Sequence, residues 1–156
     1  FMRHISLGKS LIVRYPIGSD INSAMNYIKI VVRKLKPLIT GKSVTFWVRG
    51  SSGAMLAGMI SSKIEGISIN YVRKEKEYGH NSSVHTNADI NIILDDFCRS
   101  GNTLNAIKKF MDKHGVYRVD ILILANLYDG ETELPFSFTP RILLCDDGCK
   151  SLKLLQ

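Results

Sequence analysis

The sequence predicts an α/β fold in which helices flank a central parallel sheet of about five strands. Two observations lead to this prediction. Short runs rich in apolar and β-branched residues recur along the chain, and segments with apolar residues at helical spacing lie between them. Strands that alternate with helices form parallel sheets, and such sheets bind ligands beyond the carboxyl ends of their strands. Functional residues are therefore expected in the segments that follow the strands.

Length and composition are those of one folded domain. The chain has 156 residues, of which 45% are hydrophobic, enough to bury a core. Its formal charge of +7 suits a polyanionic partner, either nucleic acid or a phosphate-rich small molecule. Apolar runs fall short of the roughly 20 residues that cross a bilayer, and the N-terminus lacks the apolar core of a signal peptide. We expect a cytoplasmic protein without a membrane partner.

The three cysteines are too few for a disulfide framework. Cys145 and Cys149 are potential metal ligands, but no pair of His or Cys residues lies at zinc-like spacing to complete a site. Reduced, structural thiols are the better interpretation of these two residues and of Cys98.

The first predicted helix runs from Asp20 to Lys36. Ser19 or Asp20 can cap its start, and Pro37 follows its end. Its apolar residues recur at helical spacing and should face the core: Ile21, Met25, Ile28, Val32 and Leu35.

The next segments predict a strand, a helix and a second strand. Val44 to Val48 is β-rich and too short for a free helix, and Ile67 to Val72 has the same character. Between them, the small apolar residues from Ala54 to Ile64 predict a helix. Arg73 to Ala88 has no apolar period and is rich in charge, Asn, Ser and Gly, which predicts a long loop. Such loops inside compact domains are uncommon and often functional.

The second half of the chain continues the alternation. Ile90 to Leu94 is almost entirely apolar, as in a strand covered on both faces. A helix with apolar positions at helical spacing follows and ends near His114–Gly115, where glycine can cap it. Val119 to Ala125 and Ile142 to Cys145 predict two more strands. The predicted helix before His114 should face the core with Leu104, Ile107, Phe110 and Met111.

The most informative segment joins the third strand to this helix. Two adjacent carboxylates, Asp95 and Asp96, end the strand, and a short turn with Ser, Gly and Thr leads into the helix. Unpaired backbone N–H groups and the helix dipole at such a start favour an anion. The neighbouring carboxylates can accept hydrogen bonds from sugar hydroxyls or lie near a metal ion. Together they suit ribose 5-phosphate, and the alternative is an ordinary capped helix.

Residues Ile92 to Thr103 (IILDDFCRSGNT) resemble the motif with which type I phosphoribosyltransferases bind phosphoribosyl pyrophosphate (PRPP). The resemblance implies that family's fold, with a small hood. It assigns Asp95 and Asp96 to the ribose hydroxyls, and to Mg²⁺ indirectly, through PRPP or water. It assigns the 5-phosphate to the turn formed by Arg99, Ser100, Gly101, Asn102 and Thr103.

A second segment is similar to the loop with which this family binds pyrophosphate. It follows the first core strand and is rich in Gly and Ser, so that backbone amides can approach a diphosphate. In the family this loop often carries a non-proline cis peptide bond. The alternative interpretation of this segment is an ordinary connection between a strand and a helix. The residues concerned are Arg49, Gly50, Ser51, Ser52 and Gly53.

The start of the long loop resembles the mobile catalytic loop of orotate phosphoribosyltransferases. There an Arg-Lys pair leaves the strand, and a further Lys and a His fold over the pyrophosphate. Arg73, Lys74, Lys76 and His80 take these catalytic roles in this sequence, although Lys76 comes one place early and an extra residue precedes His80. A solvated run of charges is the alternative.

The resemblance implies that a base nitrogen attacks PRPP and that pyrophosphate leaves. Relatives that act on 6-oxopurines usually carry Asp three residues after the acid pair, where this chain has Arg99. A cation cannot act as that general base, so 6-oxopurines are disfavoured and orotate is modestly favoured. Phe136 and Phe138 are candidates to stack on the base, and packing against the core is an equal alternative.

The family also implies a domain plan and an assembly. We expect a single domain, residues 1–156, with a core over about 38–126 and 141–147. The N-terminal segment and about 126–140 would form the hood, and a homodimer is expected. A PRPP-sensing regulator of the same fold that binds nucleic acid is the alternative function. A dinucleotide-binding domain is disfavoured because no G-x-G-x-x-G follows the first strand.

Overall fold

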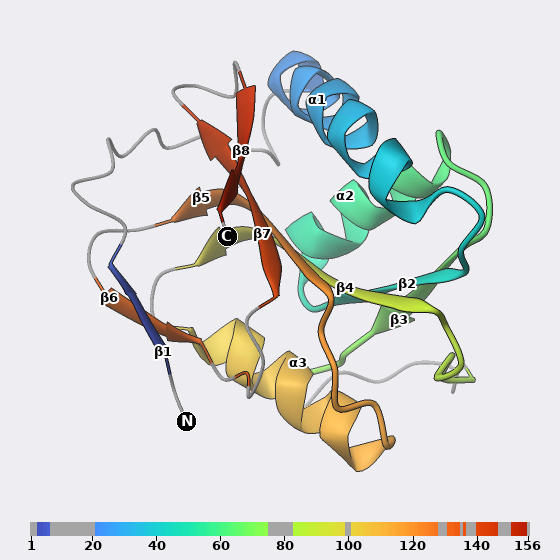
Figure 1. Cartoon of the computed structure of the whole chain (residues 1–156), viewed down its shortest axis with the longest axis vertical. Coiled ribbons are helices and arrows are strands. Elements are labelled where there is room, and N and C mark those ends of the chain that lie inside the picture. The colour runs from blue at the N-terminus through green and yellow to red at the C-terminus, as the bar shows by residue number, and fades with distance from the viewer. Residues whose placement is uncertain are drawn as a thin grey trace.

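The structure, a computed structural model, centres on one mainly parallel sheet (Figure 1). It describes residues 3–6, 21–74, 83–98, 101–127, 131–134, 136, 140–146 and 151–155. The sheet has six strands in the order β3-β2-β4-β5-β7-β8. All neighbours pair in parallel except β7 and β8, which are antiparallel. The strands are β2 (Val44–Val48), β3 (Ile67–Tyr71), β4 (Ile90–Cys98), β5 (Ile121–Leu127), β7 (Arg141–Asp146) and β8 (Ser151–Leu155).

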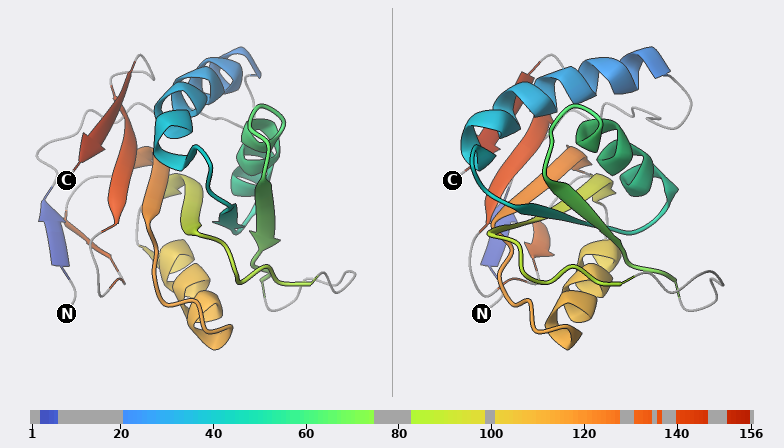
Figure 2. Two further views of the ribbon diagram at one scale, coloured as in Figure 1. Left: turned by 45° about the vertical axis from the view of Figure 1, so that its right-hand side comes forward. Right: turned by 90° about the vertical axis from the view of Figure 1, so that its right-hand side faces the viewer.

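The predicted α/β fold is confirmed: five of these strands are mutually parallel, and helices cover both faces. The antiparallel edge strand β8 was not predicted. Three helices form the outer layers: α1 (Ile21–Ile39), α2 (Ser51–Ser61) and α3 (Asn102–Lys113). Figures 1 and 2 show α1 and α2 on one face and α3 on the other. In the described part of the chain, no helix is both long and apolar enough to cross a membrane.

Strand alternation divides the core into two clusters. Phe46, Ile92 and Leu94 pack with α1 and α2, whereas Trp47 and Ile93 pack with α3. All five side chains are fully buried. The central strands are therefore apolar on both faces, which explains the continuous apolar runs in their sequence.

Helix α1 corrects one sequence prediction, because Pro37 lies inside the helix and does not follow its end. Proline removes one backbone donor, but α1 ends only two residues later, at Ile39. Ile39 is 5% exposed and packs in the core, so its burial offsets the lost hydrogen bond. The expected capping residues Ser19 and Asp20 lie outside the described residues.

The N-terminal segment and the segment after β5 are joined by a separate two-stranded sheet. β1 (Arg3–Ser6) pairs antiparallel with β6 (Glu131–Leu134). Neither strand was predicted from the sequence. These are the two segments that we expected to form a hood, and that role stays a prediction.

The C-terminus of α3 is closed by a glycine, as predicted. Gly115 has a φ of 76°, and its N–H donates to the carbonyl oxygen of Asp112 at 3.0 Å. The N–H of Val116 donates to the carbonyl oxygen of Met111 at 2.9 Å, and both side chains are buried together. This pair of bonds is the Schellman arrangement, which needs a left-handed residue after the cap.

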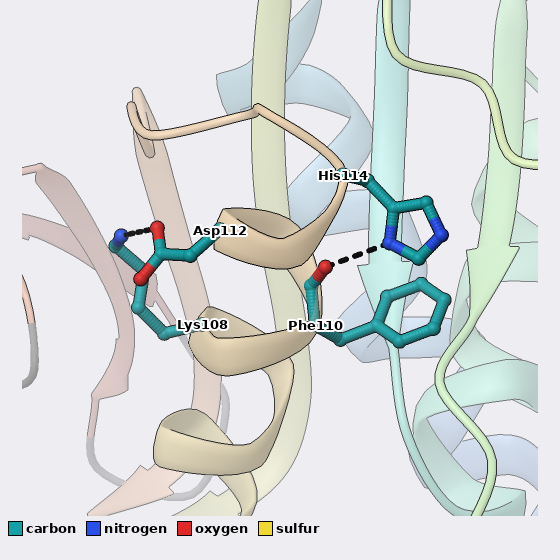
Figure 3. Close-up of polar contacts among 4 residues, drawn as sticks. All are labelled: Lys108, Phe110, Asp112 and His114. Atoms are coloured by element: carbon teal, nitrogen blue, oxygen red, sulfur yellow. Dashed lines mark hydrogen bonds and ion pairs between the residues drawn. The ribbon is translucent and has the colours of Figure 1, made fainter.

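Side-chain contacts near the same end fix α3 against the sheet. Figure 3 shows the ion pair of Lys108 with Asp112 and the contact of His114 Nδ1 with the carbonyl oxygen of Phe110. These last two atoms are 2.9 Å apart. The Phe110 ring packs edge-on against Trp47 of β2, with 6.2 Å between ring centroids. The first two contacts stabilise the last turns of α3, and the contact of Phe110 with Trp47 packs the helix on the sheet.

At the amino ends of β2 and β4, Ser43 and Asp89 bind each other. The Ser43 N–H and hydroxyl donate to Asp89 Oδ2 at 2.9 and 3.0 Å, and the Asp89 N–H donates to the Ser43 hydroxyl oxygen. The backbone N–H of Ser43, followed by its hydroxyl, lowers the pKa of Asp89. This edge is opposite to the one where ligands of parallel sheets bind.

The lowered pKa makes stability depend on pH. In the unfolded chain the carboxyl of Asp89 takes up its proton near its ordinary pKa of about 4, whereas the folded protein holds the carboxylate to lower pH. Stabilisation by Asp89 is therefore fully present above that value and is lost as pH falls through the folded pKa. We expect the gap in urea midpoint between wild type and Asp89→Ala to narrow from neutral pH to about pH 3. An equal difference in urea midpoint at both pH values would show that the charge of Asp89 contributes nothing to the stability of the folded protein.

Candidate functional site

Two helices begin at the carboxyl edge of adjacent parallel strands. β2 leads into α2, and β4 leads into α3. Trp47 of β2 lies opposite Ile93 of β4, so extending the register by two residues places Arg49 level with Asp95. Because α2 and α3 cover opposite faces, their first turns flank the end of β4 from both sides.

Helix α2 begins three residues earlier than predicted. Gly50 is its N-cap with a φ of 86°, and Ser51, Ser52 and Gly53 form its first turn. No side chain caps this turn and no acidic residue lies in it, so its N–H groups are not covered by side-chain carboxylates. Every described peptide bond is trans, including those of Arg49–Gly53, so the cis bond common in the resembling loop is absent here.

Gly53 explains how closely α2 approaches β4. A Cβ at this position would lie 3.2 Å from the carbonyl oxygen of Leu94 and 3.5 Å from Cβ of Val48. The contact with Leu94 is tighter than a side chain normally makes with backbone. Glycine therefore lets the first turn of α2 pack directly beside the residue that precedes Asp95.

Helix α3, like α2, begins after a glycine with a positive φ and has no side-chain cap. Gly101 is its N-cap in the left-handed region, with a φ of 77°, and its carbonyl oxygen accepts from the N–H of Asn105 at 2.9 Å. Asn102 and Thr103, which the sequence placed in a turn, are the first two residues of the helix. Here too no side chain caps the helix and the first turn has no acidic residue. The start of α3 is thus electropositive by its own backbone.

Three basic residues lie at the same edge. Arg49 is partly exposed at the end of β2, and Arg73 and Lys74 are exposed beyond β3. The N–H of Val72 donates to the carbonyl oxygen of Val48 at 2.7 Å, which carries the pairing of β3 with β2 to the start of the loop. The edge therefore combines two helix N-termini with cationic side chains.

The acid pair lies within β4, not after it, because the strand continues to Cys98. Pairing with β5 sustains this extension, since Asp95 is opposite Leu124 and Cys98 is opposite Leu127. Asp95 is 5% exposed, lies on the face of Ile93 and interacts within the protein. A ligand would reach this carboxylate only through the small exposed part.

Several predicted site residues are not placed. Arg99 and Ser100, Lys76 and His80, and Phe138 lie outside the described residues. Phe136 is 6% exposed and packs in the cluster with α3 and Trp47. The structure thus favours core packing over base stacking for Phe136.

The sequence model of the phosphoribosyl transferase domain matches residues 49–151, which is about two thirds of the chain. The chain belongs to this family. The matched phosphoribosyltransferase region begins at Arg49 and includes the starts of both helices and the segment after β3. No curated protein and no solved structure matches the chain.

Phosphoribosyltransferases generally use Mg²⁺ together with PRPP, and a site for the ion would lie at this edge. The described residues include no group of three His, Cys, Asp or Glu that could cage a metal. Mg²⁺ commonly binds through one or two carboxylates together with substrate phosphates and water. Asp95 and Asp96, adjacent in β4, have the chemistry for that second arrangement.

Asn70 is a residue near this edge that sequence reasoning missed. It lies in β3, is 4% exposed and bonds to the backbone of His85 in the returning part of the long loop. Its signal in the sequence is a lone Asn in an otherwise β-prone strand (ISINY), a residue type that strands disfavour.

Proposed function

We propose that this domain transfers the 5-phosphoribosyl group from PRPP to a nucleobase nitrogen, with release of pyrophosphate and in the presence of Mg²⁺. The observation that carries the proposal is the pair of glycine-initiated helix N-termini at the ends of β2 and β4. PRPP has a phosphate at one end and a diphosphate at the other. Two separate anion seats at one sheet edge match that chemistry.

The start of α3 is the proposed seat of the 5-phosphate. The backbone N–H groups of Gly101 to Leu104 and the Thr103 hydroxyl are its donors in this proposal, with Arg99 and Ser100 completing the turn. Asp95 and Asp96 precede this seat on β4 and would accept hydrogen bonds from the ribose diol. Leu104 is fully buried, and this burial anchors the first turn of α3, which carries the proposed seat.

The start of α2 is the proposed seat of the diphosphate. Its support is the uncapped first turn, Ser51 to Gly53, beside the partly exposed Arg49. Arg73 and Lys74 are exposed one strand away, beyond β3. We include Lys76 and His80 in the catalytic loop on the strength of the family resemblance.

The chemistry asked of these residues is stabilisation of a leaving group. As the bond from C1 of the ribose to the diphosphate breaks, positive charge develops on the sugar and negative charge on the diphosphate. Fixed N–H dipoles and cations at the start of α2 would lower the energy of that negative charge. Bound Mg²⁺ would add Lewis-acid neutralisation of the phosphate oxygens.

The acceptor base is proposed to be orotate or a purine. Orotate is modestly favoured by the resemblance of the segment from Arg73 to His80 to the catalytic loop of orotate phosphoribosyltransferases. Arg99 disfavours 6-oxopurines, because a guanidinium cannot serve as the general base that an Asp supplies there.

Calorimetry and a release assay test the proposal. PRPP with Mg²⁺ should bind with one site per chain, and a panel of orotate, uracil, adenine, hypoxanthine, guanine and xanthine should include a base that triggers pyrophosphate release. Absence of PRPP binding would refute the proposal.

Tight PRPP binding without release by any base would instead favour a PRPP-sensing regulator that binds nucleic acid. The observation that favours this second candidate is the charge of α1, which has no Asp or Glu. Its exposed basic residues are Lys29, Arg33, Lys34 and Lys36. An anionic polymer would be attracted to that surface.

Two glycines with similar φ, the buried Gly101 and the exposed Gly115, provide a test of the 5-phosphate seat. Gly101→Ala and Gly115→Ala each place a side chain at a φ near 77°, which costs about 1–2 kcal/mol of stability. Only Gly101 adjoins the proposed seat, so we expect its variant to weaken PRPP binding measured by calorimetry, whereas Gly115→Ala should bind normally. Equal affinities of the two variants would exclude the start of α3 from the phosphate site.

A further inference from the structure

Asn70 makes a two-point contact with the segment that returns from the long loop. Its Nδ2 donates to the carbonyl oxygen of His85 at 2.8 Å, and its Oδ1 accepts from the N–H of His85 at 2.9 Å. A side-chain amide thus pairs with both polar groups of one residue, as a neighbouring strand would. The contact spans fifteen positions of the chain and joins a buried side chain, Asn70 at 4% exposure, to the backbone of His85, whose residue is exposed.

The returning segment packs on the sheet beside β3, whereas the crossovers from β2 to β3 and from β4 to β5 each pass through a helix. Asn70 lies opposite Trp47, so its side chain is on the sheet face that α3 covers. Val72 and Val84 pack into the same cluster as Trp47. Figure 2 shows the described residues that lead into β4, 83–89, as an extended segment without a helix. Asn70 is therefore the polar anchor of this irregular covering segment.

The anchor lies close to the cations of the proposed diphosphate site. Arg73 and Lys74 follow Asn70 by three and four positions, and both are exposed. Between them and the anchor, the N–H of Val72 is held by Val48 at 2.7 Å. The chain that carries Arg73 and Lys74 is thus fixed to β2 where it leaves the sheet and to Asn70 where it returns. Tethering both ends reduces the conformations open to these two residues.

We propose that Asn70 is a positioning residue, which through the backbone of His85 holds the segment bearing Arg73 and Lys74 at the diphosphate site. This role rests on the proposed function. Asn70 does not touch the substrate, and its effect passes through the geometry of the segment that it anchors. The loss of this anchor should reduce turnover by about 10- to 100-fold, the cost of misplacing groups near a reaction centre.

Asparagine is the side chain that fits this contact, because it offers one donor and one acceptor in a plane. Asn70→Asp keeps the shape and the acceptor but turns the donor into a carboxylate oxygen that faces the carbonyl oxygen of His85. Like partial charges then repel, so the anchor should open without any change in side-chain volume. Asn70→Leu removes both bonds and serves as the second variant.

A matched control is available on the same face of the sheet. Asn91 in β4 is 8% exposed, and its Oδ1 accepts from Trp47 Nε1 at 3.0 Å. Asn91 lies opposite Thr45 at the amino half of the sheet, away from the loop. Asn91→Asp introduces the same buried charge without touching the contact with His85. It therefore reproduces a general loss of stability but not the release of the segment.

The experiment combines limited trypsin cleavage, without substrate, and steady-state kinetics at a temperature where all variants are folded. We expect Asn70→Asp and Asn70→Leu to raise the cleavage rate after Arg73 and Lys74 by about tenfold. Their kcat should fall while KM for PRPP changes by less than about threefold. Asn91→Asp should leave cleavage at these bonds and kcat near the wild-type values.

Each result bears on whether Asn70 anchors the segment that carries Arg73 and Lys74. Unchanged cleavage in both Asn70 variants would overturn the anchor, and equal loss of kcat in Asn91→Asp would overturn its specific role. If wild type releases no pyrophosphate with any base, the proposed function fails and the positioning role with it. Faster cleavage in the Asn70 variants would in that case still show that the contact with His85 restrains the segment, although the proposed activity is absent.

Discussion

Replacing Asp96 with Asn is expected to weaken PRPP binding by about 10- to 100-fold, with little change in the melting temperature. The carboxylate can accept hydrogen bonds from a sugar diol on both oxygens, whereas an amide replaces one acceptor with a donor. A charge-assisted hydrogen bond contributes about 1.5–3 kcal/mol, which corresponds to this loss of affinity. Calorimetry with PRPP and Mg²⁺ measures the affinity, and thermal unfolding measures the stability.

Asp95→Asn is the natural comparison. Asp95 is 5% exposed and interacts within the protein, so its replacement should lower both stability and affinity. The interpretation fails if Asp96→Asn lowers the melting temperature sharply while the folded fraction binds PRPP as well as wild type. Asp96 would then have a structural role and not a role in binding.

The double variant Lys74→Ala, Lys76→Ala is expected to lose turnover by about 100-fold or more, with a change in PRPP affinity of less than about tenfold. Negative charge on the diphosphate grows as the bond to ribose breaks, so cations beside it lower the energy of the transition state more than that of the bound substrate. Single-turnover release of pyrophosphate measures the step directly.

A control with the same loss of charge separates this effect from general attraction of an anion. Lys109 and Lys113 are exposed on α3. Lys113 is in the last turn of this helix, at the end opposite to the proposed phosphate seat. Lys109→Ala, Lys113→Ala should retain wild-type turnover. Equal losses in both double variants would show that net charge matters and that the segment after β3 has no specific role.

The five parallel strands and their order along the chain could be predicted because each one has a strong local signal, whereas β1, β6 and β8 were not predicted. Val44 to Val48 is a run of five buried residues, with three apolar side chains on one face of the sheet and Thr45 and Trp47 on the other, and the structure gives the same bounds. Gly115 could be predicted as a cap because the apolar period of α3 stops just before it. Local pattern is sufficient where burial or a left-handed residue is required.

Other features depend on contacts between distant segments. Pro37 stays in α1 because Ile39 is buried against the sheet, which no local signal reveals. β4 continues through Asp95 to Cys98 because β5 pairs with it, although charged residues usually end a strand. The same holds for Asn70, whose partner lies fifteen positions away. In the candidate site, the glycine turns could be predicted from the sequence. The arrangement of α2 and α3 on the two sides of β4 could not.

The measurement that tests the account most directly is a backbone amide NMR titration with PRPP and Mg²⁺. If the two helix starts are the anion seats, the largest shift changes should occur at the amides of Ser51 to Gly53 and of Gly101 to Leu104, where N–H groups would face the phosphates. The amides of Ser43 and Asp89, at the opposite edge, should barely move. Shifts concentrated at that opposite edge, with the two helix starts unchanged, would contradict the account.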